Sequence, residues 1–110
     1  MEKQITIEYD GAKYTLAFTR KTVQAISANG FDPDMIKSQP ANGIPMLFNG
    51  AFLVHHRGML DSKKQQIYDS LEDRPGLINK LLTMYLEPIN AMIEEPTTEK
   101  KVKWEANFEE

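Results

Sequence analysis

The dipeptide Asp10-Gly11, which lies between two alternating segments, is the feature that most constrains the fold of this chain. Both central positions of a type I′ turn need a positive φ angle, and Asp-Gly is one of the pairs that adopt it most readily. A two-residue loop pairs Ile7 with Tyr14, and this register places the apolar side chains of both strands on one face. The sequence therefore predicts an N-terminal β-hairpin whose apolar face packs against other elements.

Apolar residues recur with helical spacing after the hairpin. Thr19 is expected to cap a short helix that ends at Asn29 and Gly30. The last helix carries the widest apolar stripe, which runs from Leu77 to Ile93. The expected helical segments are residues 19–29, a brief turn over 32–36, 44–55 with Pro45 in the first turn, about 61–73, and 77–93, with 38–43 as a connector.

These elements predict an α+β fold, in which an N-terminal β-hairpin packs on a bundle of about four or five helices. A chain of 110 residues with 41% hydrophobic content is ordinary for one globular domain. We expect that domain over residues 1–96, followed by a polar linker and an alternating tail over 97–110. The side chains expected to meet in the core are Phe48, Phe52, Leu81 and Tyr85.

The tail segment 101–108 alternates strictly and contains the only tryptophan of the chain. Alternation puts the apolar side chains on one face of a strand and the polar side chains on the other. The tail either adds a strand to the hairpin and buries Trp104, or stays exposed and awaits a partner. Flanking glutamates and the linker favour a tail that is mobile in the monomer. Its apolar row consists of Val102, Trp104, Ala106 and Phe108.

Two residues of the last helix, Met84 and Leu86, lie off its main apolar stripe. Core packing is the favoured role for the methionines of this chain, and a contribution to a contact surface is the alternative for these two. The residues predicted to bind a partner are Val102, Trp104, Phe108, Met84 and Leu86.

The polar side chains that could carry chemistry have simpler structural interpretations. Helical spacing places His55 on the core-facing stripe and His56 about 100° away, with no third metal ligand nearby. Asp69, Glu72 and Asp73 cluster at a helix end and are interpreted as a solvated surface rather than an acid–base pair. The glycines and serines follow no phosphate-binding or nucleophile pattern. We therefore predict no enzyme, and no catalytic, cofactor or metal site.

Composition excludes further classes of protein. The chain lacks cysteine, which excludes disulfides and fits a cytoplasmic location. A net charge of −3 without a basic face argues against nucleic acid, and Lys63-Lys64 is interpreted as solvated surface. The longest apolar run, over residues 51–54, is too short to cross a bilayer, and the N-terminus lacks the apolar region of a signal peptide. We expect a soluble protein without membrane contact.

The order of these features resembles the small tail assembly chaperones of long-tailed phages and prophages. The matching segments are residues 9–20 (YDGAKYTLAFTR), 29–33 (NGFDP), 44–52 (IPMLFNGAF) followed by His55-His56, and 82–90 (LTMYLEPIN). The resemblance spans nearly the whole chain up to the linker. It implies a non-enzymatic protein of the bacterial cytoplasm that coats the tape-measure protein, recruits tail-tube subunits and is absent from the finished tail. It carries no site residues across.

Two other functions stay open at this point. A structural tail-completion or connector protein would persist in purified phage particles, and self-association of the chain is compatible with either role. A small ligand-binding domain or enzyme would need a polar pocket around His55, which the sequence does not favour.

Overall fold

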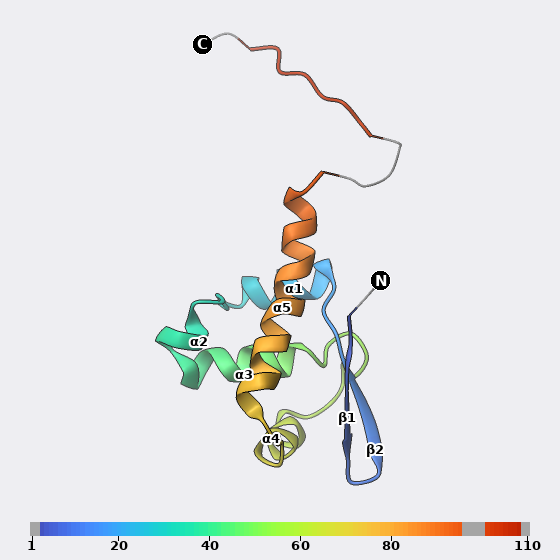
Figure 1. The fold of residues 1–110 in the computed structure, drawn as a ribbon, viewed down its shortest axis with the longest axis vertical. Helices are drawn as coiled ribbons and strands as arrows, with labels where there is room; N and C mark the ends of the chain where they lie inside the picture. The colour runs from blue at the N-terminus through green and yellow to red at the C-terminus, as the bar shows by residue number, and fades with distance from the viewer. Residues whose placement is uncertain (1–2, 96–100, 109–110) are drawn as a thin grey trace.

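The computed structural model describes residues 3–95 and 101–108. Within these residues a two-stranded antiparallel hairpin is followed by five helices, so the predicted α+β fold is confirmed (Figure 1). Most of the predicted linker, residues 96–100, lies outside the described residues. The elements are β1 (Ile5–Tyr9), β2 (Ala12–Leu16), α1 (Arg20–Ala28), α2 (Met35–Ser38), α3 (Pro40–Gly50), α4 (Asp61–Asp69) and α5 (Arg74–Ile93).

The hairpin has the predicted turn and register. Asp10 and Gly11 have φ angles of 53° and 79°, as a type I′ turn requires. Ile7 pairs with Tyr14, and the same register holds along both strands. Ile7 is buried, so the apolar face of the hairpin covers the core.

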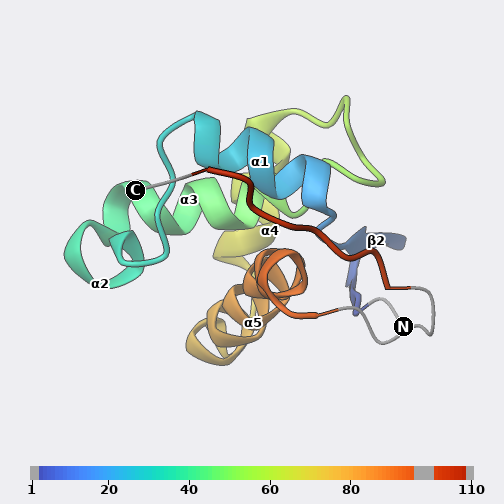
Figure 2. The same ribbon diagram turned by 90° about the horizontal axis from the view of Figure 1, so that it is seen from above.

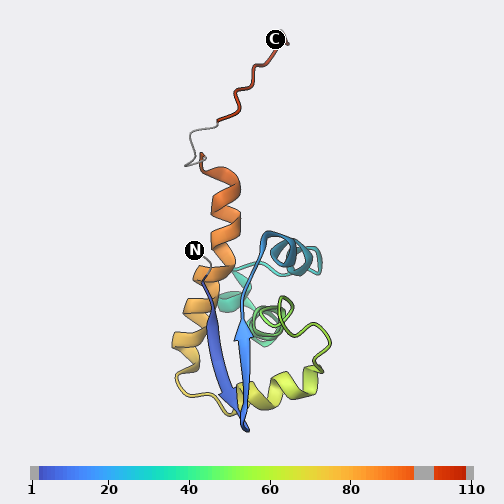
Figure 3. The ribbon, with the colours of Figure 1, turned by 90° about the vertical axis from the view of Figure 1, so that its right-hand side faces the viewer.

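The outer edge of β2 is occupied by the segment that follows α3. The Thr15 N–H donates to Nε2 of His56 at 3.0 Å, and the Ala17 N–H donates to the Ala51 carbonyl at 3.0 Å. Seen from the side, α5 runs along β1, whereas α1, α3 and α4 lie on the β2 side (Figure 3). The hairpin is therefore attached to the helices through one edge as well as through its apolar face.

Helix α1 begins and ends as predicted. The Thr19 hydroxyl accepts a hydrogen bond from the Thr22 N–H at 3.2 Å, and the Thr22 hydroxyl accepts one from the Thr19 N–H at 2.9 Å. This reciprocal cap satisfies two backbone donors that the first turn leaves free. After the helix, Gly30 has a φ of 105°, which a side chain would disfavour.

Two boundaries predicted around α3 are wrong. Residues 40–43, predicted as part of a connector, form the first turn of α3, because Pro40 occupies a first-turn position that needs no N–H donor. Pro45 consequently lies inside the helix rather than in its first turn. The helix also ends at Gly50, and residues 51–55 form turns. The apolar spacing continues past the true end because turns pack on the same core.

The four aromatic and leucine side chains predicted to meet in the core are all buried within one cluster. The Phe48 and Phe52 rings are 5.1 Å apart. The Tyr85 ring lies 5.6 Å from that of Phe18 and 5.0 Å from that of Phe31, in edge-to-face arrangements. In Figure 2, α5 lies to one side of α1 and α3, and it packs against both, so this cluster lies between the three helices.

The buried phenol of Tyr85 predicts a loss of stability in alkali. Burial raises the pKa of Tyr85, the Ser27 side chain lowers it and the charge of Asp32 raises it further. The unfolded chain then ionises this phenol first, from about pH 10, so its contribution to stability is complete below that pH and is lost above it. Denaturant titrations should show wild type losing stability more steeply above about pH 10 than Tyr85→Phe does. Equal slopes would contradict the prediction.

Candidate functional site

The apolar side chains of the tail are exposed in the structure. Val102, Trp104 and Phe108 are 93%, 86% and 73% exposed, and residues 101–108 form neither helix nor strand. The segment lies beyond the end of α5, away from the hairpin (Figures 1 and 3). These three residues therefore stand free of the core, as a partner-binding role requires.

The C-terminal turns of α5 extend the exposed apolar surface. Met92 and Ile93 were predicted to face the core, and this prediction is wrong: both are exposed, because α5 projects beyond the other helices (Figure 1). Leu86 is also exposed, and it lies seven residues from Ile93 on the same face of the helix. We call Leu86, Met92 and Ile93 the distal surface of α5.

The two residues of α5 predicted for a contact surface have different environments. Met84 is 6% exposed and belongs to the core cluster, which is the role favoured for the methionines of this chain. Its side chain offers little area to a partner, because it points between the packed elements. Of the pair, only Leu86 contributes to the distal surface of α5.

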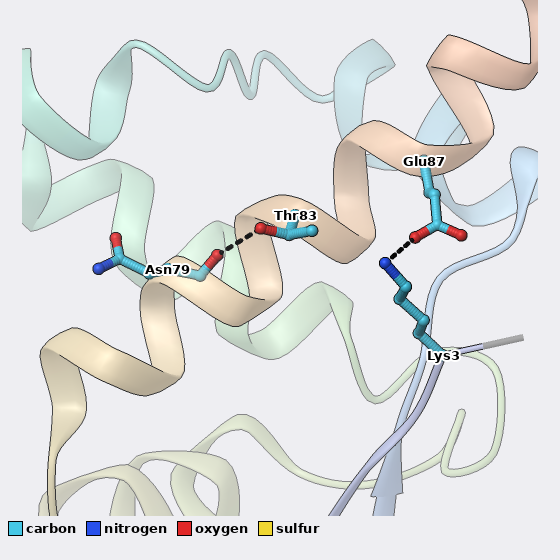
Figure 4. Close-up of polar contacts among 4 residues, drawn as sticks. All are labelled: Lys3, Asn79, Thr83 and Glu87. Carbon is cyan, nitrogen blue, oxygen red and sulfur yellow. Dashed lines mark hydrogen bonds and ion pairs between the residues drawn. The ribbon is translucent and has the colours of Figure 1, made fainter.

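A hollow of about 450 Å³ lies beside the exposed turns of α5. At this hollow, Nζ of Lys3 lies 2.8 Å from Oε2 of Glu87, an ion pair that connects the start of the hairpin to α5 (Figure 4). Both side chains are about half exposed, so solvent weakens their attraction. The pair therefore contributes more to the position of the hairpin on α5 than to stability. One turn earlier, the Thr83 hydroxyl donates to the Asn79 carbonyl at 3.1 Å. The hollow is lined by Lys3, Phe18, Met84, Glu87, Pro88, Asn90, Ala91 and Glu94.

The two histidines have the opposite orientations to those predicted. His55 is exposed, whereas His56 is half-buried and accepts the hydrogen bond from Thr15. Its ring lies 5.3 Å from that of Tyr14 and 6.1 Å from that of Phe52. The helical spacing does not hold here, because α3 ends at Gly50. His56 thus holds the edge of β2, a role that no sequence motif indicates.

Lys64 is also not the solvated residue predicted from the sequence. It is 5% exposed, with Nζ 3.3 Å from the Asp61 carboxylate and 5.8 Å from the centre of the Phe52 ring. The carboxylate is exposed, and the aliphatic stem of the lysine covers apolar surface. Sequence reasoning missed this residue because α4 places Lys64 against a ring that lies twelve positions earlier.

The acidic cluster near the start of α5 contains one helix cap and two exposed carboxylates. The Asp73 carboxylate accepts a hydrogen bond from the Gly76 N–H at 3.2 Å and so caps α5, whereas Asp69 and Glu72 are exposed. Across residues 3–95 and 101–108, no three metal-ligating side chains come together. Within the same ranges, none of the helices combines the length and the apolar character needed to cross a membrane.

The sequence matches one family model. That model, described as a domain of unknown function (DUF5055), covers residues 1–108. Neither a curated protein nor a solved structure gives a significant match. Because the match extends from before the hairpin to the end of the apolar row in the tail, the chain belongs to the DUF5055 family.

Proposed function

We propose that this chain is a non-enzymatic phage tail assembly chaperone, which binds the tape-measure protein and helps to recruit tail-tube subunits. The observation that carries the proposal is the distal surface of α5, where Leu86, Met92 and Ile93 are exposed and the last turns of the helix project beyond the other helices. Exposed apolar groups at the end of a projecting helix are suited to hold an apolar partner. The resemblance to tail assembly chaperones supplies the identity of that partner.

The distal surface of α5 suits a helical partner in particular. Leu86 and Ile93 are spaced by two helical turns, which is the spacing at which one helix presents an apolar stripe to another. The hollow beside Glu87 and Pro88 can receive a side chain that projects from such a partner. Covering these groups keeps both proteins soluble until the partner is handed to the growing tail.

Co-expression with the tape-measure protein of the same genome tests this function. Wild type is expected to co-purify with it and to raise its soluble fraction. The double variant Leu86→Ser/Ile93→Ser should lose most of both effects, because it removes the apolar stripe without touching the core. Leu60→Ser is the matched control, since Leu60 is an exposed leucine that lies before α4, away from the distal surface of α5.

Three results would contradict the proposal. The first is the absence of any complex between wild type and the tape-measure protein, and the second is retention of the complex in the double variant. The third is stoichiometric presence of the chain in purified virions, detected by mass spectrometry, which would favour a structural tail component.

A further inference from the structure

The hairpin has one occupied edge and one open edge. In a two-residue hairpin the pair next to the turn exchanges hydrogen bonds, and so does every second pair after it. The backbone groups of Thr6 and Glu8 therefore point away from β2, as do those of Thr15 and Ala17 from β1. On the β2 side both donors are bonded. On the β1 side, the part of the chain that the structure describes supplies no partner for the N–H of Thr6 or Glu8.

The tail has the pattern of a strand but no strand to pair with in the structure. Residues 101–108 are long enough for a strand and alternate between apolar and polar side chains, yet they pair with nothing in the structure. An exposed strand edge and an exposed amphipathic segment are both features that proteins usually cover. We infer that the tail of one copy adds to the open edge of β1 in a second copy, as a third, antiparallel strand.

Charge selects the register of this strand. When Lys103 lies opposite Glu8, Lys101 comes to lie beside the turn that carries Asp10, and both acids are exposed. A shift of two residues in one direction sets Glu105 against Glu8, and a shift in the other direction leaves only Lys101 beside an acid. A slip of one residue turns the apolar row of the tail to solvent.

The same register completes the apolar face of the sheet. Trp104 comes to lie next to Ile7 and Ala106 next to Ile5, whose side chain is only partly buried in the monomer. Phe108 comes to lie beside Lys3, at a hollow of about 380 Å³ between β1 and α5. The hollow is lined by Lys3, Gln4, Ile5, Lys80, Thr83 and Met84.

Geometry favours the tail of a second copy over the chain's own tail. Helix α5 runs antiparallel to β1 (Figures 1 and 3), and the ion pair sets Lys3 beside Glu87. Val102 has to reach Tyr9, about 20 Å along β1 from Lys3, whereas Ile93 lies about 9 Å beyond Glu87 in the other direction. The chain's own tail would need to span about 29 Å with nine residue steps, whose limit is about 30–32 Å. A second copy is under no such constraint.

Each copy offers one tail and one edge, so association is head-to-tail and can continue along a row of copies. This inference does not rest on the proposed function, because the purified chain alone contains both parts of the interface. The two proposals can therefore fail separately.

Sedimentation velocity of the purified full chain over a series of concentrations tests the inference. Wild type is expected to form larger species as concentration rises. The Trp104 fluorescence should shift to the blue over the same range of concentrations. Trp104→Ala should remain monomeric while keeping the melting temperature of the wild-type monomer, because Trp104 touches no core residue in the monomer.

A charge exchange tests the register. Lys103→Glu and Glu8→Lys should each weaken association about two- to fivefold by setting like charges opposite one another, and the double variant should restore it. Lys21→Glu changes the net charge as much as Lys103→Glu does, but it lies on α1, so it should not change association. A monomer at all concentrations, a fluorescence shift that is independent of concentration, or single variants that the double variant does not rescue would each overturn the inference.

Discussion

Replacing Phe52 with alanine is expected to lower the free energy of unfolding by about 3–5 kcal/mol. The side chain is fully buried, and its ring lies against those of Phe48 and Tyr14 at centroid distances of 5.1 Å and 6.4 Å. Truncation removes apolar contact and leaves a cavity that these neighbours cannot fill completely. Urea titration followed by circular dichroism measures the loss.

The matched control for this substitution is Leu60→Ala. Leu60 is a large apolar residue that is mostly exposed, so its truncation should change stability by less than about 0.5 kcal/mol. If Phe52→Ala costs as little as the control, Phe52 does not occupy the core described above.

Gly43→Ala is expected to destabilise the protein by about 1–3 kcal/mol, although alanine is the better helix former. A Cβ atom at this position would lie 2.8 Å from both the backbone carbonyl carbon and the Cβ of Met35. Backbone atoms cannot rotate away as a side chain can, so α2 and α3 have to separate. Thermal denaturation should show the loss as a lower melting temperature.

Gly58→Ala separates this steric effect from the general effect of removing a glycine. Nothing lies within 4 Å of a Cβ added at Gly58, so this variant should be neutral or slightly stabilising. If the two variants behave alike, the close approach of α2 and α3 is not what requires Gly43.

Some elements could be predicted from the sequence because their causes are local. The turn at Asp10-Gly11 and the cap at Thr19 depend on φ preferences and on hydrogen bonds over three residues. The burial of Phe48 followed from helical spacing within one segment, because Phe48 lies inside α3. Such features need no knowledge of which elements become neighbours.

The sites that the sequence analysis placed wrongly depend on distant neighbours. His56, rather than His55, faces inward because α3 ends early and the following turn lies along β2. Lys64 is buried because α4 places it against the Phe52 ring. Neither contact leaves a periodic signal, since each joins segments whose separation in sequence is arbitrary.

The C-terminal part of the molecule also combines features that the sequence determined with features that depend on neighbouring elements. By itself, the sequence determined that the last helix has an apolar stripe and that residues 101–108 alternate as a strand does. Only the tertiary structure decided that this stripe is covered at Leu81 and Tyr85 and exposed at Ile93, and that β2 has its outer edge occupied while β1 does not. The physical reason is that periodicity specifies which face of an element is apolar, whereas the lengths and positions of neighbouring elements determine how much of that face they cover.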